Sequence, residues 1–148
     1  KQGGAAVVSY NMSDSDVERL MVQPWTMTGS DGDLVPMGVG APHPRTYGAY
    51  PHKLKHYVKE KGVLSLSEAI KSMTGLPASV FRVKDRGQIR VGSFADINIF
   101  NMEKINDPSI YTDPHHISEG VEYLFVNGIL AIDNGEFTGI KAGKVLKK

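Results

Sequence analysis

The residues with the clearest chemical potential lie in one stretch, TMTGSDGDLVPMGVGAPHPR, at residues 26–45. Asp31 follows directly after a run of strand-forming residues that ends at Gly29. A carboxylate in that place could move a proton, because functional groups of parallel α/β folds lie on the loops after the carboxyl ends of strands. Asp before Gly is also a common turn residue, so spacing alone leaves both interpretations of Asp31 open.

Arg45 ends the Gly/Pro-rich loop that follows, in the tripeptide His43-Pro44-Arg45. Arg is the natural bidentate partner of a carboxylate, and the neighbouring prolines stiffen the loop that carries it. Arg45 is therefore a candidate for binding an anionic substrate, with a solvated loop side chain as the alternative. His43 could be a ligand, but a His-Pro pair in a loop is more often structural.

The remaining histidines form two pairs. His52 and His56 are four residues apart, a spacing that can bring two imidazoles to one zinc ion on a helix. No Glu lies between them, and two intervening lysines would repel a metal, so a structural role is favoured. The adjacent His115 and His116 lie in a polar stretch typical of a surface linker.

If Asp31 has a chemical role, a strand should precede it, and the sequence before Asp31 predicts such a strand. Residues 5–10 form an uncharged apolar run typical of a buried parallel strand. Ser13 and Asp16 have capping-box spacing at the start of a helix, which Pro24 ends. Residues 25–29 predict a second short strand. A strand, a helix and a strand with short connections indicate a βαβ unit.

Further helices are predicted after the loop. The stretch of residues 50–62 carries apolar positions at helical spacing, with Lys59 and Lys61 near the C-terminus of the predicted helix and Gly62 just beyond it. Ser65 and Glu68 form a second capping box before an apolar stripe that Gly75 ends. A short turn of helix follows.

The character of the sequence changes near residue 85. Glycine and β-branched residues become frequent, helical periodicity ends, and short strand-forming runs alternate with turns. Asn127-Gly128 between two apolar runs is a strong hairpin signal, and Asn134-Gly135 predicts another turn. We therefore expect an α/β unit over residues 1–84 and a small β domain over residues 85–148.

The composition limits the class of protein. Hydrophobic residues make up 41% and charged residues 22%, which argues against disorder, and the net charge is +1. Nucleic acid is not expected as a partner, because phosphate binding needs clustered Lys and Arg. No apolar run approaches the roughly 20 residues of a membrane helix, so no membrane association is expected. The absence of cysteine rules out thiolate zinc ligands here and fits a cytoplasmic location.

Two stretches of the β part resemble a known family. Residues 87–100, GQIRVGSFADINIF, resemble the C-terminal signature of the amidohydrolase superfamily, and residues 121–148 look like its continuation. TMTGSDG then resembles the eighth barrel strand ending in the superfamily's Asp. Together with HPR and the segments at residues 65–81 and 86–92, the chain is similar over essentially its whole length to the N-acyl-D-amino-acid deacylases, or D-aminoacylases.

The resemblance implies a fold class of α/β plus β. Residues 1–84 would be the C-terminal βα elements of a metal-dependent-hydrolase TIM barrel, with strands seven and eight and the following helices. Residues 85–148 would be part of a small β-sandwich domain, the composite domain. The implied activity is a zinc-dependent hydrolysis of the amide bond of N-acyl-D-amino acids, and the small-molecule substrate is the expected partner.

The resemblance also assigns roles to residues. Asp31 matches the family's strand-eight Asp, which accepts a proton from the zinc-bound water and returns one to the leaving amine. Arg45 matches the Arg of the family's HPR, a candidate to hold the substrate's α-carboxylate. Ser30 matches a small polar residue that lines the site, and His43 a residue that shapes the loop.

The chain also departs from the family. The zinc-binding histidines and cysteine have no counterpart here, so Asp31 could contribute only to a second or weak metal site. Zinc is expected in the whole enzyme and not tightly bound by this chain. The chain alone is expected to be inactive, because two strands cannot close an eight-stranded barrel.

Two alternatives remain open. One is a hydantoinase-like or dihydroorotase-like cyclic amidase, which the HPR loop disfavours because those substrates present their carboxylates differently. The other is a non-catalytic binding or oligomerisation module.

The chain opens KQGGAAVV, without an initiator Met, which favours a piece of a longer protein. Barrel elements without their neighbours leave an apolar face uncovered. We therefore expect self-association through exposed barrel surface, at residues such as Val7, Val8, Met21 and Val22.

Overall fold

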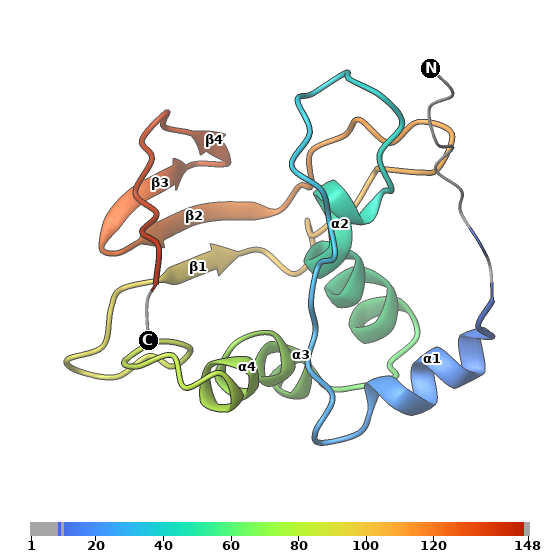
Figure 1. Ribbon diagram of the computed structural model, residues 1–148, viewed down its shortest axis with the longest axis horizontal. Helices are drawn as coiled ribbons and strands as arrows, with labels where there is room; N and C mark the ends of the chain where they lie inside the picture. Colours follow the sequence, from blue (N-terminus) through green and yellow to red (C-terminus); the bar gives the residue numbers. More distant parts are fainter. Residues whose placement is uncertain (1–8, 10, 147–148) are drawn as a thin grey trace, which may run out of the picture.

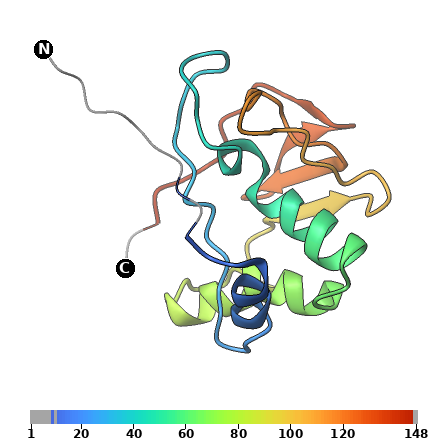
Figure 2. The ribbon, with the colours of Figure 1, turned by 90° about the vertical axis from the view of Figure 1, so that its right-hand side faces the viewer.

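The computed structural model describes Ser9 and residues 11–146. Figure 1 shows the helices at one end of the molecule and a small sheet beside them. Figure 2, turned by 90°, places the sheet above helices α3 and α4, with long loops at the upper edge. In Figure 1 the C-terminal segment runs back from β4 across the sheet to the start of β1.

Helix α1 spans Asp14–Met21, where the capping signal predicts a helix. The Ser13 hydroxyl oxygen accepts a hydrogen bond from the Asp16 backbone N–H at 3.2 Å and donates one to the Asp16 carboxylate at 2.7 Å. The side chain thereby satisfies one of the N–H groups that the first helical turn leaves without a partner. The predicted start of this helix is confirmed.

Helix α2, Arg45–His52, continues directly into a π-helical segment η1, Lys53–Glu60. Pro51 lies inside α2 and has no N–H to donate to the carbonyl of Tyr47, four residues earlier. The Ser118 hydroxyl donates to that carbonyl instead. A residue far along the chain therefore satisfies the backbone group that the proline leaves over.

Helices α3, Leu66–Met73, and α4, Gly75–Val80, follow. The predicted capping box at the start of α3 is complete. The Ser65 hydroxyl accepts the Glu68 N–H, and the Glu68 carboxylate accepts the Ser65 N–H at 2.8 Å. Thr74 separates the two helices and donates its hydroxyl to the Ile70 carbonyl.

The β part forms one antiparallel sheet. The strands are β1 Ile97–Phe100, β2 Val121–Val126, β3 Ile129–Asp133 and β4 Glu136–Phe137, in the order β1-β2-β3-β4. The predicted Asn-Gly turns join the last three strands. Asn127 and Asn134 both have positive φ angles, 51° and 48°, which Asn tolerates better than most residues.

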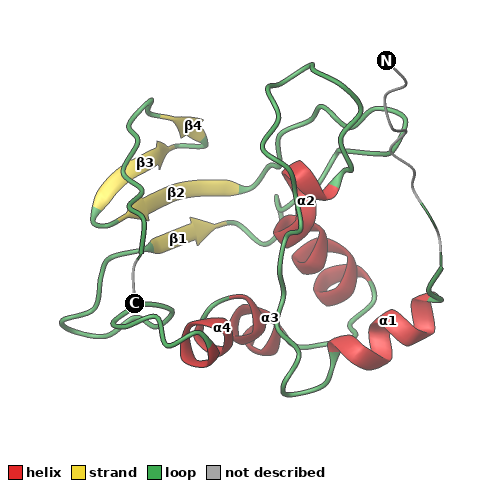
Figure 3. Cartoon of the chain, viewed as in Figure 1, coloured by secondary structure: helices red, strands yellow, loops and turns green. Residues whose placement is uncertain are grey.

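Two predicted strands do not form. Residues 25–29 carry no strand, and neither do residues 87–92, the first of the strand-forming runs expected after residue 85. Figure 3 shows a long segment without helix or strand between α1 and α2. A strand exists only with a hydrogen-bonded neighbour, and here the Thr28 N–H donates instead to the Ser72 carbonyl in α3. The strand predicted at residues 5–10 lies outside the described residues except for Ser9.

The core lies between the helices and the segment after β1. Leu54, Leu64, Ala69 and Ile105 form a buried cluster, and Met21 packs against it. Ile105 belongs to the part of the chain assigned to the β domain. The predicted boundary near residue 85 therefore separates kinds of secondary structure, while apolar burial crosses it; the division into two domains stays a prediction.

The residues expected to drive self-association differ in their surroundings. Met21 contacts the core, whereas Val22 is 49% exposed. Val7 and Val8 lie outside the described residues. Self-association stays a prediction. Within the described residues, every helix is too short or too polar to cross a membrane.

Candidate active site

The structure brings Asp31 and Arg45 together. Nη2 of Arg45 lies 2.6 Å from Oδ2 of Asp31, and Nε donates a hydrogen bond to the Asp31 carbonyl at 2.7 Å. The Asp31 side chain is 83% exposed and that of Arg45 43% exposed. Such an exposed pair contributes about 1 kcal/mol or less to stability. Its groups are consequently accessible to a bound molecule.

Local backbone geometry explains the pairing. Asp31 has a φ of 47°, a left-handed conformation that Asp adopts more readily than most residues. Gly32 then passes so close to helix α2 that a Cβ there would lie 2.9 Å from the Cα of Thr46. The glycine lets the loop reach the first turn of the helix that carries Arg45. Asp31 therefore has the conformation of a turn residue and still faces the Arg45 guanidinium.

Ser30 is half-buried beside this pair in the chain. Its hydroxyl oxygen accepts the Gly32 N–H at 3.5 Å, a long hydrogen bond. The contact shapes the turn around Asp31. The site-lining role of Ser30 stays a prediction.

His43 holds the end of the loop. Its Nδ1 accepts the backbone N–H of Arg45 at 3.1 Å, which leaves Nε2 as the protonated nitrogen of the neutral ring, 3.1 Å from the Tyr111 hydroxyl. The two rings meet edge to face with centroids 4.9 Å apart. These contacts fix the backbone at Arg45 and agree with the loop-shaping role expected for His43.

The protonation of His43 is coupled to this geometry. Burial lowers the pKa of His43 below its usual value of 6.5, the Arg45 guanidinium lowers it further, and the Asp31 carboxylate opposes both. The unfolded chain therefore takes up the proton more readily than the folded chain. The stability that the neutral ring contributes is present above pH 6.5 and is lost as the pH falls through the lowered pKa.

We expect the free energy of unfolding, measured with urea between pH 5 and 7.5, to fall as the pH drops below 6.5. The variant His43→Gln should lack this component, because an uncharged amide replaces the titrating ring. The variant His116→Gln should keep it. An NMR titration of the folded chain that places the His43 midpoint at or above 6.5 would contradict the expectation.

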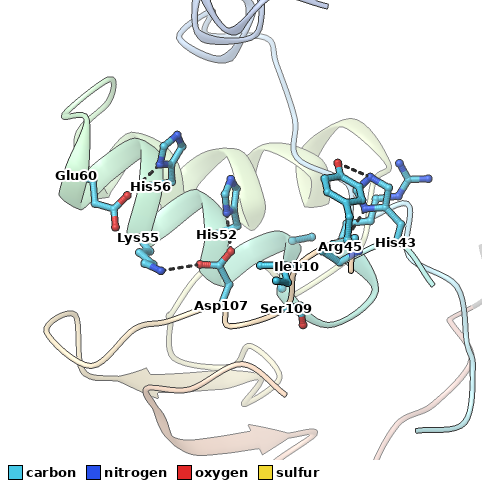
Figure 4. A pocket seen from close by; sticks show the side chains of 13 residues that line it. His43, Arg45, His52, Lys55, His56, Glu60, Asp107, Ser109 and Ile110 are labelled. Atoms are coloured by element: carbon cyan, nitrogen blue, oxygen red, sulfur yellow. Dashed lines mark hydrogen bonds and ion pairs between the residues drawn. The ribbon is translucent and has the colours of Figure 1, made fainter. Parts of the chain in front are cut away.

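His43 and Arg45 line one end of an open cavity of about 440 Å³. Figure 4 shows the cavity running along α2 and η1 toward His56 and Glu60, with Asp107 and Ser109 on the facing segment. A small molecule could enter beside Arg45.

His115 has a structural role that its neighbours in the sequence do not indicate. Its Nδ1 lies 3.0 Å from the Tyr47 hydroxyl and accepts the Gly38 N–H at 3.2 Å, and Nε2 donates to the Gly40 carbonyl at 3.0 Å. It thereby ties the loop before Arg45 to the segment after β1, and these two loops lie side by side in Figure 1. The prediction of a surface linker is wrong for His115, because its partners are 68 to 77 residues away in the chain. The His116 side chain bonds nearby, to Asp113.

Lys53 is a buried cation that sequence reasoning missed. It is 4% exposed, and its ammonium donates to the Thr28 hydroxyl at 2.7 Å and the Ser72 hydroxyl at 2.8 Å. Burial lowers the pKa of Lys53. The sequence does carry a sign of this burial: Lys53 lies four residues before Tyr57, which places it on the apolar face of the helix. The contacts hold the segment before Asp31 against α3.

Across residues 9 and 11–146, no group of three or more His, Cys, Asp or Glu side chains is arranged to hold a metal ion. The Asp31 carboxylate is instead paired with the Arg45 guanidinium. The described residues therefore do not form a zinc centre of the kind with three or four protein ligands.

Comparison with known proteins decides the family. The model of the amidohydrolase family matches residues 4–131. The chain belongs to the amidohydrolase family. A D-aminoacylase from Alcaligenes xylosoxydans xylosoxydans is 35% identical to this amidohydrolase chain over 144 residues, 97% of the chain and 29% of the relative.

Solved structures agree with the assignment. A crystal structure of D-aminoacylase, described as defining a novel subset of amidohydrolases, has a TM-score of 0.85 and 36% identity over 93% of this chain and 28% of its own. An N-acyl-D-glutamate deacylase from Bordetella bronchiseptica, complexed with zinc and a phosphonate that mimics the tetrahedral intermediate, has a TM-score of 0.75 and 33% identity over 81% and 25%. The amidohydrolase chain thus matches the D-aminoacylase fold over the part that it covers, which is less than a third of these relatives.

Proposed function

We propose that this chain is the C-terminal part of a zinc-dependent amidohydrolase that hydrolyses the amide bond of N-acyl-D-amino acids. The proposal rests on one observation above the others: in a chain of this family, Asp31 of the segment TMTGSDG presents its carboxylate to the Arg45 guanidinium at 2.6 Å. One residue can exchange protons and the other can bind a carboxylate, and an N-acyl amino acid requires both at neighbouring positions.

Asp31 would handle the protons of the reaction. Hydrolysis adds water across the C–N bond, so one proton must leave the attacking water and one must reach the amine that departs. Asp31 would accept the first through a carboxylate oxygen and deliver it to the amine nitrogen. Zinc, bound by residues outside this chain, would supply an activated nucleophile and polarise the carbonyl.

Arg45 would hold the α-carboxylate of the substrate. Nη2 and Nε are engaged with Asp31. A guanidinium has five N–H donors, which leaves donors for a second carboxylate in the same plane. His43 would keep the backbone at Arg45 in place through its acceptor nitrogen. We also propose that Ser30 lines the site and that the strands form the composite β domain of the family.

Substrate assays on the longer protein that contains this chain test the proposal. We expect turnover of N-acetyl-D-amino acids and little turnover of the L-enantiomers. With the α-carboxylate bound to Arg45, only one enantiomer would place its amide nitrogen next to Asp31. Preferential turnover of hydantoin or dihydroorotate would favour the cyclic amidase instead. A protein inactive on all of them, with zinc bound, would favour the non-catalytic module.

A further inference from the structure

The proposed function makes no use of His52 and His56, which line the cavity beyond Arg45. Their rings are stacked, with centroids 5.1 Å apart and planes inclined by 24° (Figure 4). His52 is the last residue of α2, and His56 lies on η1. The rings are 47% and 32% exposed, so both are accessible from the cavity.

A carboxylate orients each ring. Nδ1 of His52 lies 2.6 Å from Oδ2 of Asp107, and Nδ1 of His56 lies 3.0 Å from Oε2 of Glu60. An ionised carboxylate only accepts hydrogen bonds, so Nδ1 carries the proton and Nε2 of the neutral ring keeps a free lone pair. Within the described residues neither Nε2 has a hydrogen-bond partner. Histidines that bind metals show this arrangement, in which an outer carboxylate fixes the tautomer.

The two lysines between the histidines do not oppose a cation as the sequence suggested. Lys53 points into the core, where its ammonium binds the hydroxyls of Thr28 and Ser72. Lys55 binds the side-chain carbonyl of Asn106 at 2.9 Å and lies 3.6 Å from Oδ1 of Asp107. The cavity therefore has two carboxylates, Asp107 and Glu60, and one nearby ammonium, that of Lys55, so the local charge does not repel a cation.

The helix that carries the pair is unusual. The π-helical segment begins at Lys53, between the two histidines. The π-helix is rare, and π-helical turns within α-helices occur frequently at functional sites. The ring of Tyr57 meets both imidazoles edge on, with centroids 5.7 Å from His52 and 4.9 Å from His56. Each imidazole is thus positioned by a carboxylate, by the other imidazole and by the Tyr57 ring.

We propose that His52 and His56 bind one divalent transition-metal ion of the class that imidazole favours, Zn²⁺, Cu²⁺ or Ni²⁺, through their Nε2 atoms. The site has two protein ligands, and water in the cavity completes the coordination. Oxygen-seeking ions such as Mg²⁺ and Ca²⁺ are not ligands of choice for such a pair. Among the three candidate ions Cu²⁺ should bind most tightly, because affinities at nitrogen sites follow that order.

Titration of the chain with Cu²⁺ tests the proposal and needs no enzymatic activity, so its result is independent of the proposed function. We expect one Cu²⁺ per chain by calorimetry and an EPR signal with nitrogen coupling from two imidazoles. His52→Gln and His56→Gln should each weaken binding at least tenfold. Asp107→Asn should weaken it about 10–100-fold, the usual effect of removing an outer carboxylate. His116→Gln is the matched control, because it removes a carboxylate-bound histidine outside the cavity.

The NMR spectrum of the unaltered chain gives a second readout that does not depend on how the variants fold. Substoichiometric Cu²⁺ should broaden the ring signals of His52 and His56 first. The rings of His43 and His115 should broaden less, since both of their nitrogens already have partners. No Cu²⁺ binding, binding unchanged in both cavity variants, or first broadening at another histidine would overturn the proposal.

Discussion

Replacing Asp31 with Asn in the whole enzyme is expected to lower kcat by about 10²–10⁴-fold, the usual contribution of a positioned proton-transfer group. The amide has the size of the carboxylate and can still accept a hydrogen bond from Arg45, but it cannot take up a proton from water. The KM should change little, because the substrate carboxylate would bind to Arg45 and not to Asp31. Steady-state kinetics with an N-acetyl-D-amino acid measure both constants.

The control for this variant lies two residues away. Asp33 is also exposed and on the same loop, so Asp33→Asn changes the net charge by the same amount. We expect it to retain nearly full activity. The Asp31 variant should also unfold at nearly the same urea concentration as the parent, because the exposed pair with Arg45 contributes about 1 kcal/mol or less. Full turnover by Asp31→Asn would show that Asp31 is not the proton-transfer group.

Replacing Arg45 with Met is expected to lower kcat/KM about 10–100-fold. Hydrogen bonds to a charged group contribute about 1.5–3 kcal/mol, which corresponds to this range of affinity. The effect should be mainly on KM, with a smaller loss in kcat because Arg45 also contacts Asp31. Arg45→Lys should recover part of the loss, since it restores the charge without the planar fork of donors.

A change of substrate separates the clamp from a general structural role. The parent should discriminate strongly between an N-acetyl-D-amino acid and its α-carboxamide, which carries no negative charge. The Arg45→Met variant should lose most of this discrimination. Arg90→Met, at another exposed arginine, should behave like the parent. If Arg45→Met discriminates as well as the parent does, Arg45 is not the carboxylate clamp.

Local sequence determined the elements with short-range causes. The capping box at Ser65 formed as predicted, and Ser13 caps α1 through its hydroxyl, because these donors and acceptors lie within three residues. The Asn-Gly turns formed because Asn127 and Asn134 accept a positive φ. The family could also be recognised from sequence, since its signatures are short stretches with fixed spacing, and the match over residues 4–131 bears this out.

The strands and the long-range contacts could not be predicted in this way. The segment before Asp31 has strand-forming residues, but Thr28 pairs with Ser72 in a helix, and no local pattern specifies that partner. Lys53 is buried although it carries a charge, because the hydroxyls of Thr28 and Ser72, distant in the chain, accept hydrogen bonds from its ammonium.

The family, the capped helices, the hairpin turns and the two candidate groups, Asp31 and Arg45, could all be predicted from local sequence. Only the tertiary structure decided that these groups meet at 2.6 Å and that His115 fastens the loop before Arg45. It also placed Asp107 against His52. The physical reason is distance along the chain: caps and turns are fixed by neighbours a few residues apart, whereas these partners are brought together only when the whole chain packs.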